Sequence, residues 1–282
     1  MSFKPAIILA LVDLSPATGD VLAWTRLFAQ KTSAKVRILH VIWPPATRVS
    51  SQEEGAILLD EFEERRLDLR GSIKAHAQEI LGDIPFEMEV GVGHPVKVAL
   101  ETIAALRPGL IVLGSHGHDG ITRSLLGSVA ENVVRESAFP TLIVKATDVE
   151  PALKTILCPV DLGDVAAQSL DTAAEMARVF GARLDVLRVL PQCPNADEEL
   201  KAMRQWVPEI VAQRCPTSES VHTGDTAEQI VVFARQHDSD LIVVGAEPRR
   251  FLEFTVLGRT TERVVRHGPC SVLVVRLEPR SN

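Results

Sequence analysis

The chain contains the same sequence pattern twice. An apolar run that ends in aspartate, residues 8–13, matches residues 156–161 at an offset of 148 positions, and residues 34–41 match residues 182–189 at the same offset. Residues 110–114 then match residues 241–245 at an offset of 131, so the second copy is 17 residues shorter (148 minus 131). This repeat predicts two tandem copies of one folding unit of about 140 residues.

The boundary between the copies falls in residues 146–154, a short polar stretch with one proline. We predict a first domain over residues 1–147 and a second over residues 154–282. So short a linker keeps the two domains close together.

Strand patterns alternate with helix patterns in both copies. The strands expected in the first copy are residues 6–12, 35–42, 86–90, 110–113 and 141–145, and those in the second are residues 155–160, 184–190, 220–222, 241–244 and 272–276. Helical patterns between them include residues 52–81 and 96–106 in the first copy, and residues 166–180 and 196–213 in the second. Such alternation indicates right-handed crossovers and a parallel sheet in each copy.

The stretch from residue 108 to residue 145 combines a buried strand, a glycine loop and a helix start. The strand ends at Gly114, the loop contains Gly117, and Gly127-Ser128 precedes a helical pattern. Ser128 followed three residues later by Glu131 predicts a capping box. Glycines let backbone N–H groups approach a ligand, and a helix N-terminus attracts anions, so these residues form a plausible phosphate site.

The spacing of this stretch is Gly-x2-Gly-x9-Gly-Ser, within GSHGHDG and LLGSVAENVV. It differs from the Rossmann fingerprint and the P-loop, and it resembles the nucleotide-binding signature of universal stress proteins. The resemblance covers nearly the whole chain. It implies an ATP-binding α/β protein with two tandem Rossmann-like, flavodoxin-like domains, each a five-stranded parallel sheet of order 3-2-1-4-5 with helices on both faces.

In that strand order a ligand binds between strands one and four, beyond their carboxyl ends. The residues that the resemblance implies as nucleotide contacts are Asp13, Val41, Gly114, Gly117, Gly127, Ser128 and Val129. Asp13 either lies near the nucleotide or caps the first helix, and the backbone of Val41 either meets the adenine edge or is plain core. The Ser128 hydroxyl either donates to a phosphate oxygen or caps its helix. Any Mg²⁺ would reach the phosphates mainly through water and substrate oxygens.

Other polar residues in the loop carry weaker signals. The spacing of His116, His118 and Asp119 is a poor basis for a metal centre, so we expect no protein metal site. Arg123 either contacts the γ-phosphate or is solvated. The four cysteines form no CxxC pair, which indicates reduced thiols.

The second copy departs from the motif. Pro248 replaces Gly117 and Arg259 replaces Ser128, whereas the counterparts Asp161, Gly245 and Gly258 are kept. Proline removes an N–H and fixes φ, so we predict that the second copy binds ATP weakly or not at all. Arginines 249 and 250 could hold another anion there.

Composition excludes several classes of protein. The net charge of −7 and pI near 5.7 disfavour nucleic-acid binding. Apolar runs are too short for a membrane span, so we expect a soluble cytoplasmic protein. Because units of the family dimerise through strand five, residues 141–145 and 272–276 could pair within one chain. The chain would then be either a monomer with internal pseudo-symmetry or a homodimer of tandem chains.

The first functional hypothesis is an ATP-binding regulator of the stress response. Occupancy of the first copy would order residues 114–128 for an unknown regulatory protein partner. The chain has no nucleophile elbow and no P-loop lysine, so efficient catalysis lacks identifiable machinery. The alternatives are a slow ATPase or autophosphorylating enzyme that uses Asp13, His116 or Ser128, and a scaffold or small-ligand binder independent of nucleotide.

Overall fold

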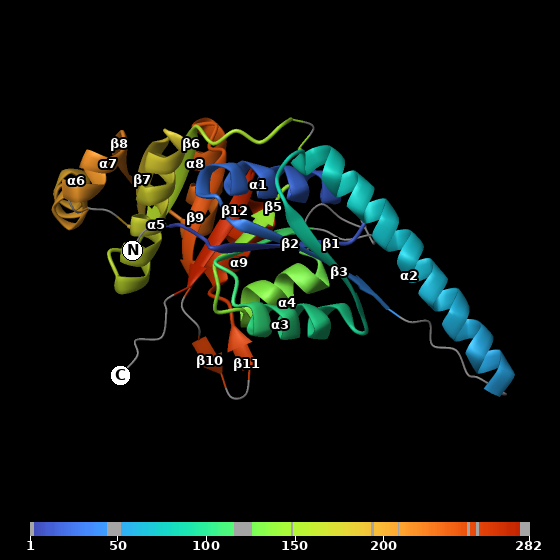
Figure 1. Cartoon of the computed structure of the whole chain (residues 1–282). Helices are drawn as coiled ribbons and strands as arrows, with labels where there is room; N and C mark the ends of the chain where they lie inside the picture. The colour runs from blue at the N-terminus through green and yellow to red at the C-terminus, as the bar shows by residue number, and fades with distance from the viewer. Residues whose placement is uncertain are drawn as a thin grey trace.

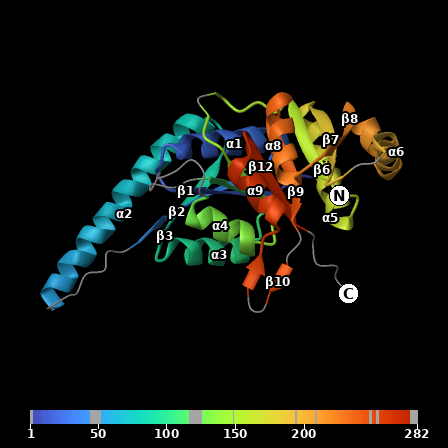
Figure 2. The same cartoon turned by 180° about the vertical axis from the view of Figure 1, so that it is seen from behind.

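The computed structural model describes residues 3–43, 52–115, 126–147, 149–192, 195–207, 209–246, 249–251 and 254–276. The strands and helices of the first half are β1 (Ile7–Val12), α1 (Ala17–Thr32), β2 (Lys35–Ile42), α2 (Gln52–Leu81), β3 (Phe86–Val92), α3 (Pro95–Leu106), β4 (Leu110–Gly114), α4 (Ser128–Glu136) and β5 (Thr141–Val144). Those of the second half are β6 (Thr155–Val160), α5 (Asp164–Phe180), β7 (Arg183–Leu190), α6 (Ala196–Trp206), α7 (Glu209–Arg214), β8 (Thr217–Thr223), α8 (Thr226–Gln236), β9 (Leu241–Ala246), β10 (Arg249–Phe251), β11 (Phe254–Val256), α9 (Arg259–His267) and β12 (Ser271–Arg276). Figures 1 and 2 show their arrangement.

Both halves have the predicted α/β topology. The strand order is β3-β2-β1-β4-β5 in the first half and β8-β7-β6-β9-β12 in the second, and every pairing within these sets is parallel. Each half therefore has the order 3-2-1-4-5. Several expected boundaries differ: β3 runs to Val92, two residues further than predicted, β8 begins at Thr217, three residues earlier than predicted, and the helix expected over residues 196–213 is divided into α6 and α7. Pro208, which has no N–H to donate, stands between those two helices in the sequence.

The two halves share one sheet. β5 and β12 pair antiparallel, with Leu273 opposite Leu142, and this pairing joins the halves into a ten-stranded sheet. Chains paired in this way are related by an approximate two-fold axis, as in an isologous dimer. The pairing that the family resemblance suggested thus occurs within this one chain.

Helices cover both faces of this sheet. One face carries a single continuous core in which residues of α1, α2, α5, α6 and α7 pack together across both halves. The other face has two separate clusters, one under α3 and α4 and one under α8 and α9. Alternate residues of a strand point to opposite faces, so Ile8 and Ala10 join the continuous core whereas Leu9 joins the α3–α4 cluster.

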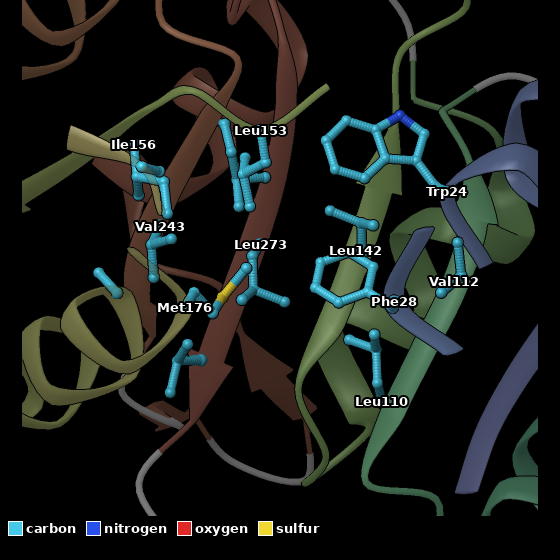
Figure 3. Packing of buried hydrophobic residues seen from close by; sticks show 14 of the residues in the cluster. Trp24, Phe28, Leu110, Val112, Leu142, Leu153, Ile156, Met176, Val243 and Leu273 are labelled. Atoms are coloured by element: carbon cyan, nitrogen blue, oxygen red, sulfur yellow. The ribbon is translucent and has the colours of Figure 1, made fainter. Parts of the chain in front are cut away.

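Aromatic side chains join the two halves within the continuous core. Phe28 of α1 is fully buried, and its ring centroid lies 5.3 Å from that of Phe180 of α5 in an edge-on arrangement. Figure 3 shows Phe28 and Trp24 beside Leu142 of β5, with Leu273 and Met176 of the second half close by. The seam between the halves is therefore a well-packed apolar interior.

Basic residues at the ends of β5 and β12 bind helices of the opposite half. The guanidinium of Arg276 donates to the carbonyls of Val134 and Arg135, the latter at 2.6 Å, in the last turn of α4. By the 131-residue repeat its counterpart is Lys145, whose ammonium donates to the Arg266 carbonyl of α9 at 3.1 Å. Cations suit helix C-termini because the carbonyls there have no partner within the helix. Burial lowers the pKa of both basic groups.

Replacing Arg276 with methionine should lower the free energy of unfolding by about 1.5–3 kcal/mol, since hydrogen bonds from a charged donor would be lost and buried helix carbonyls left unpaired. Arg276 is only 6% exposed, so water cannot readily replace the hydrogen bonds that its guanidinium donates. Urea denaturation monitored by circular dichroism measures the loss. Arg235→Met, at an exposed position of α8, is the control and should change stability little. Equal effects of the two substitutions would contradict the capping role.

Candidate functional site

The candidate site lies at the carboxyl ends of β1 and β4. These strands are parallel neighbours, with Leu11 opposite Leu113, so Asp13 and Gly114 follow them at the same edge of the sheet. The start of α4 is held at this edge because the Gly127 N–H donates to the Ser115 carbonyl at 2.8 Å. The strand order reverses here, which is where open α/β sheets bind ligands.

The helix start differs from the prediction. Ser128 is not the N-cap: Gly127 occupies that position, with φ −61° and ψ 148°, and no side chain caps the helix. The Gly127 carbonyl accepts from the Glu131 N–H at 2.9 Å, so the first helical hydrogen bond begins one residue earlier than expected. The predicted capping box is therefore wrong. Ser128 becomes the first helical residue, and it is exposed.

This arrangement favours an anion. The N–H groups of the first residues of a helix have no partner within the helix, and among the described residues no capping side chain supplies one here. The N–H groups of Ser128 and Val129 are among them. They carry the positive end of the helix dipole, which attracts phosphate or carboxylate groups.

Asp13 has a structural role in the turn after β1. Its Oδ1 accepts a hydrogen bond from the Ser15 N–H at 3.0 Å, and Leu14 between them has φ 63°. The N-cap of α1 is Pro16, which no side chain caps, so Asp13 stabilises the turn and not the helix start. The second half repeats the turn: Asp161 accepts from the Gly163 N–H at 2.9 Å.

Two buried hydroxyl groups follow this turn. Ser15 and Thr18 are 6% and 3% exposed, and within the described residues neither hydroxyl has a hydrogen-bond partner. Buried polar groups are almost always paired, so these oxygens are available to a ligand or water at the end of β1. Nothing in the sequence distinguished Thr18 from other helix residues.

Strand β2 adds Val41 and His40 beside β1. The side chain of Val41 is half-buried and packs against the α3–α4 cluster, which agrees with the interpretation as core and leaves its backbone at the end of the strand. His40 is buried, with Nδ1 2.8 Å from the Val12 carbonyl. A carbonyl only accepts, so Nδ1 carries the proton. This contact could not be predicted from the sequence, because it depends on the register of β1 and β2.

Several predicted residues lie outside the described residues. These are Gly117 of the proposed phosphate site and its loop neighbours His116, His118, Asp119 and Arg123. The residues that the structure does bring to one edge of the sheet are Asp13, Gly114, Gly127, Ser128 and Val129, with Val41 at the end of the strand next to β1.

The second half keeps more of the site than its sequence indicated. Gly258 is the N-cap of α9 with φ −60° and ψ 140°, nearly the values of Gly127. A cavity of about 450 Å³ opens at the carboxyl ends of β6 and β9. Its polar lining includes Asp161, Arg259 and Thr260, and its apolar lining includes Leu187 and Val189. The helix start and the crevice therefore persist although Arg259 replaces serine and Pro248 lies outside the described residues.

Gly245 shows why β9 and α5 can approach so closely in this second crevice. A Cβ at this position would lie 2.5 Å from Cγ1 and 3.0 Å from the carbonyl oxygen of Val165. Only glycine fits such a separation without displacing the start of α5. Gly114 occupies the equivalent position in the first half.

The fold, with a reversal of strand order in each half, defines a doubly wound α/β protein built from two similar units. The model of the Universal stress protein family matches residues 6–145 and again residues 152–276, so the chain belongs to this family. A universal stress protein of Mycolicibacterium smegmatis is 24% identical over 95% of this chain and 96% of its own length. One of Methanocaldococcus jannaschii is 27% identical over 45% of this chain and 84% of its own length.

A solved structure has the same architecture. The crystal structure of a universal stress protein from Archaeoglobus fulgidus superposes with a TM-score of 0.75 and 22% identity. The match covers 96% of this chain and 98% of the Archaeoglobus chain. At this identity the likeness concerns the fold alone. Among the described residues, no helix combines the length and the apolar character that crossing a membrane requires.

Proposed function

We propose that this universal stress protein binds ATP in its first half and acts as a nucleotide-dependent regulator. The observation that carries the proposal is the uncapped start of α4, fixed at the end of β4 by the Gly127–Ser115 hydrogen bond. The phosphates would accept from the N–H groups of Ser128 and Val129. The hydroxyls of Ser15 and Thr18, which have no hydrogen-bond partner among the described residues, fit further polar contacts near β1.

Two other features support an adenine nucleotide. Val41 is the last residue but one of β2, next to the end of β1, where its backbone could meet a base edge. Gly117, in the motif of the family, would add a backbone N–H to the phosphates. Any Mg²⁺ would be held chiefly by ATP oxygens and water.

Calorimetric titration of MgATP into the full chain tests the proposal. We expect one site per chain, and adenosine, which lacks phosphates, should bind at least about tenfold more weakly, because each charge-assisted hydrogen bond contributes about 1.5–3 kcal/mol. Absence of binding would refute the proposal and favour a scaffold. Two equal sites would show that Pro248 and Arg259 are tolerated, and equal affinity for adenosine would place the phosphates away from α4.

A further inference from the structure

The long helix α2 extends beyond the body of the protein. Its 30 residues correspond to about 45 Å. Its carboxyl-terminal end lies against α1, whereas its amino-terminal turns run away from the sheet in both views (Figures 1 and 2). We call residues 52–72 the arm.

None of the described side chains of the arm, residues 62–72, is buried. The buried α2 side chains among those described are Ile73, Ala77 and Leu81, all beyond the arm. A Cβ added at Gly71 would meet nothing within 4 Å, whereas one at Gly19 of α1 would be 4.0 Å from Ile80. The body therefore covers α2 only in its last turns.

The apolar face of α2 nevertheless continues along the arm. Phe62 and Leu69 precede the buried Ile73 by eleven and four positions, a spacing that places all three on one face of a helix. Phe62 and Leu69 are only partly covered, and neither belongs to a core cluster of the body. A face that is core at one end of the helix is thus only partly covered by the described residues at the other.

An isolated arm of this composition would be a weak helix. Most helical stability in proteins comes from packing of an amphipathic face, and an interior glycine such as Gly71 costs about 1 kcal/mol relative to alanine. Covering the apolar face with another helix would stabilise it.

The acidic and basic residues of the arm are separated along its length, and this separation favours a second arm in the antiparallel orientation as the partner. Residues 53–64 contain only acidic charges, namely Glu53, Glu54, Asp60, Glu61, Glu63 and Glu64. Residues 65–74 are mainly basic, namely Arg65, Arg66, Arg70 and Lys74, with Asp68 as the exception. Two arms side by side in parallel would place like charges together, whereas two antiparallel arms place the acidic half of each beside the basic half of the other.

We propose that the arm packs antiparallel against the arm of a second copy of this chain, with Phe62 and Leu69 in the seam. A two-fold pair of this kind is closed, because each arm uses the same surface. It also leaves β5 and β12 paired within each chain, so the assembly is a dimer of tandem chains joined through α2.

A matched pair of substitutions on the arm tests the proposal. Leu67 and Leu69 are two positions apart, so they point to nearly opposite sides of the helix, and Leu67 is 61% exposed. In sedimentation velocity of the full chain, the wild type should form dimers as concentration rises. Leu69→Glu should weaken dimerisation by at least about 100-fold, since the leucine is buried twice in a two-fold pair. Leu67→Glu should leave it unchanged.

Reversed charges provide a second test that does not depend on the apolar face. One variant gives the arm a net positive charge, with Glu61→Lys, Glu63→Lys and Glu64→Lys, and another makes it strongly acidic, with Arg65→Glu, Arg66→Glu and Arg70→Glu. Each should be monomeric alone, and an equimolar mixture should restore the dimer. A wild type that stays monomeric at about 100 μM, equal behaviour of Leu67→Glu and Leu69→Glu, or a mixture that fails to associate would overturn the proposal.

Discussion

Replacing Ser128 with proline should weaken ATP binding by at least about tenfold while leaving the thermal stability of the chain nearly unchanged. Proline is well tolerated at the first position of a helix, where its missing N–H has no helical partner in any case. The Gly127 cap has φ −61° and ψ 148°, an extended conformation that a following proline prefers. The substitution therefore removes the N–H and the hydroxyl that we propose as ligand contacts, without breaking the fold.

Ser128→Ala separates the two groups that proline removes. It deletes the hydroxyl and keeps the N–H, so it should lower the affinity less than Ser128→Pro does. Isothermal titration calorimetry gives the affinities, and differential scanning calorimetry checks the stability of each variant.

The second half supplies the control for this experiment. Arg259 is the first residue of α9, and its Gly258 cap has nearly the same backbone angles as Gly127. Arg259→Pro should leave ATP binding by the full chain unchanged, because the proposed site is in the first half. A loss of ATP binding in Arg259→Pro with none in Ser128→Pro would move the site to the 450 Å³ cavity of the second half.

Replacing Phe28 with alanine should lower the free energy of unfolding by about 3–5 kcal/mol, since deleting a buried ring removes its transfer free energy and leaves a cavity. Phe28 is fully buried, and its ring contacts Phe3, Trp24 and Phe180. The contact with Phe180 crosses between the halves. Urea denaturation, followed by circular dichroism, should therefore show one transition that shifts as a whole.

A double-mutant cycle measures how strongly the halves are coupled. Phe28→Ala combined with Phe180→Ala should give a coupling free energy of about 0.5–1.5 kcal/mol, typical of an edge-on aromatic pair. Phe86 of β3, on an outer strand of the same core, is the control, and Phe86→Ala should be additive with Phe180→Ala. Two separate unfolding transitions, or no coupling between Phe28 and Phe180, would show that the halves fold independently.

The two halves differ in the residues at the start of the helix that follows strand four, and the proposed function depends on this difference. Both halves keep the aspartate turn after the first strand and a glycine cap before the crevice helix. Only the first half keeps Ser128 and the full glycine spacing. A single ATP site in the first half, as we propose, would fit a regulator that responds once to nucleotide, and the Ser128 and Arg259 variants test this asymmetry directly.

The sequence by itself determined the repeat, the alternation of strands and helices and, through the family resemblance, the strand order of each half. These features depend on local patterns: apolar runs end at Asp13 and Gly114, and the same runs recur at Asp161 and Gly245. Such patterns can be recognised in one sequence without an alignment, because a buried strand needs apolar residues along its length. The crevice at the ends of strands one and four follows from that order.

Tertiary structure decided what the site residues contact, and it fixed the pairing between the halves that the family resemblance had only suggested. The pairing of Leu142 with Leu273 joins residues 131 positions apart, and the binding of Arg276 to α4 spans a similar separation. The shift of the cap from Ser128 to Gly127 depends on the hydrogen bond to Ser115, and the role of Asp13 depends on the left-handed turn at Leu14. No local pattern encodes such contacts, because they form only when segments distant in the sequence fold onto one sheet and share one interior.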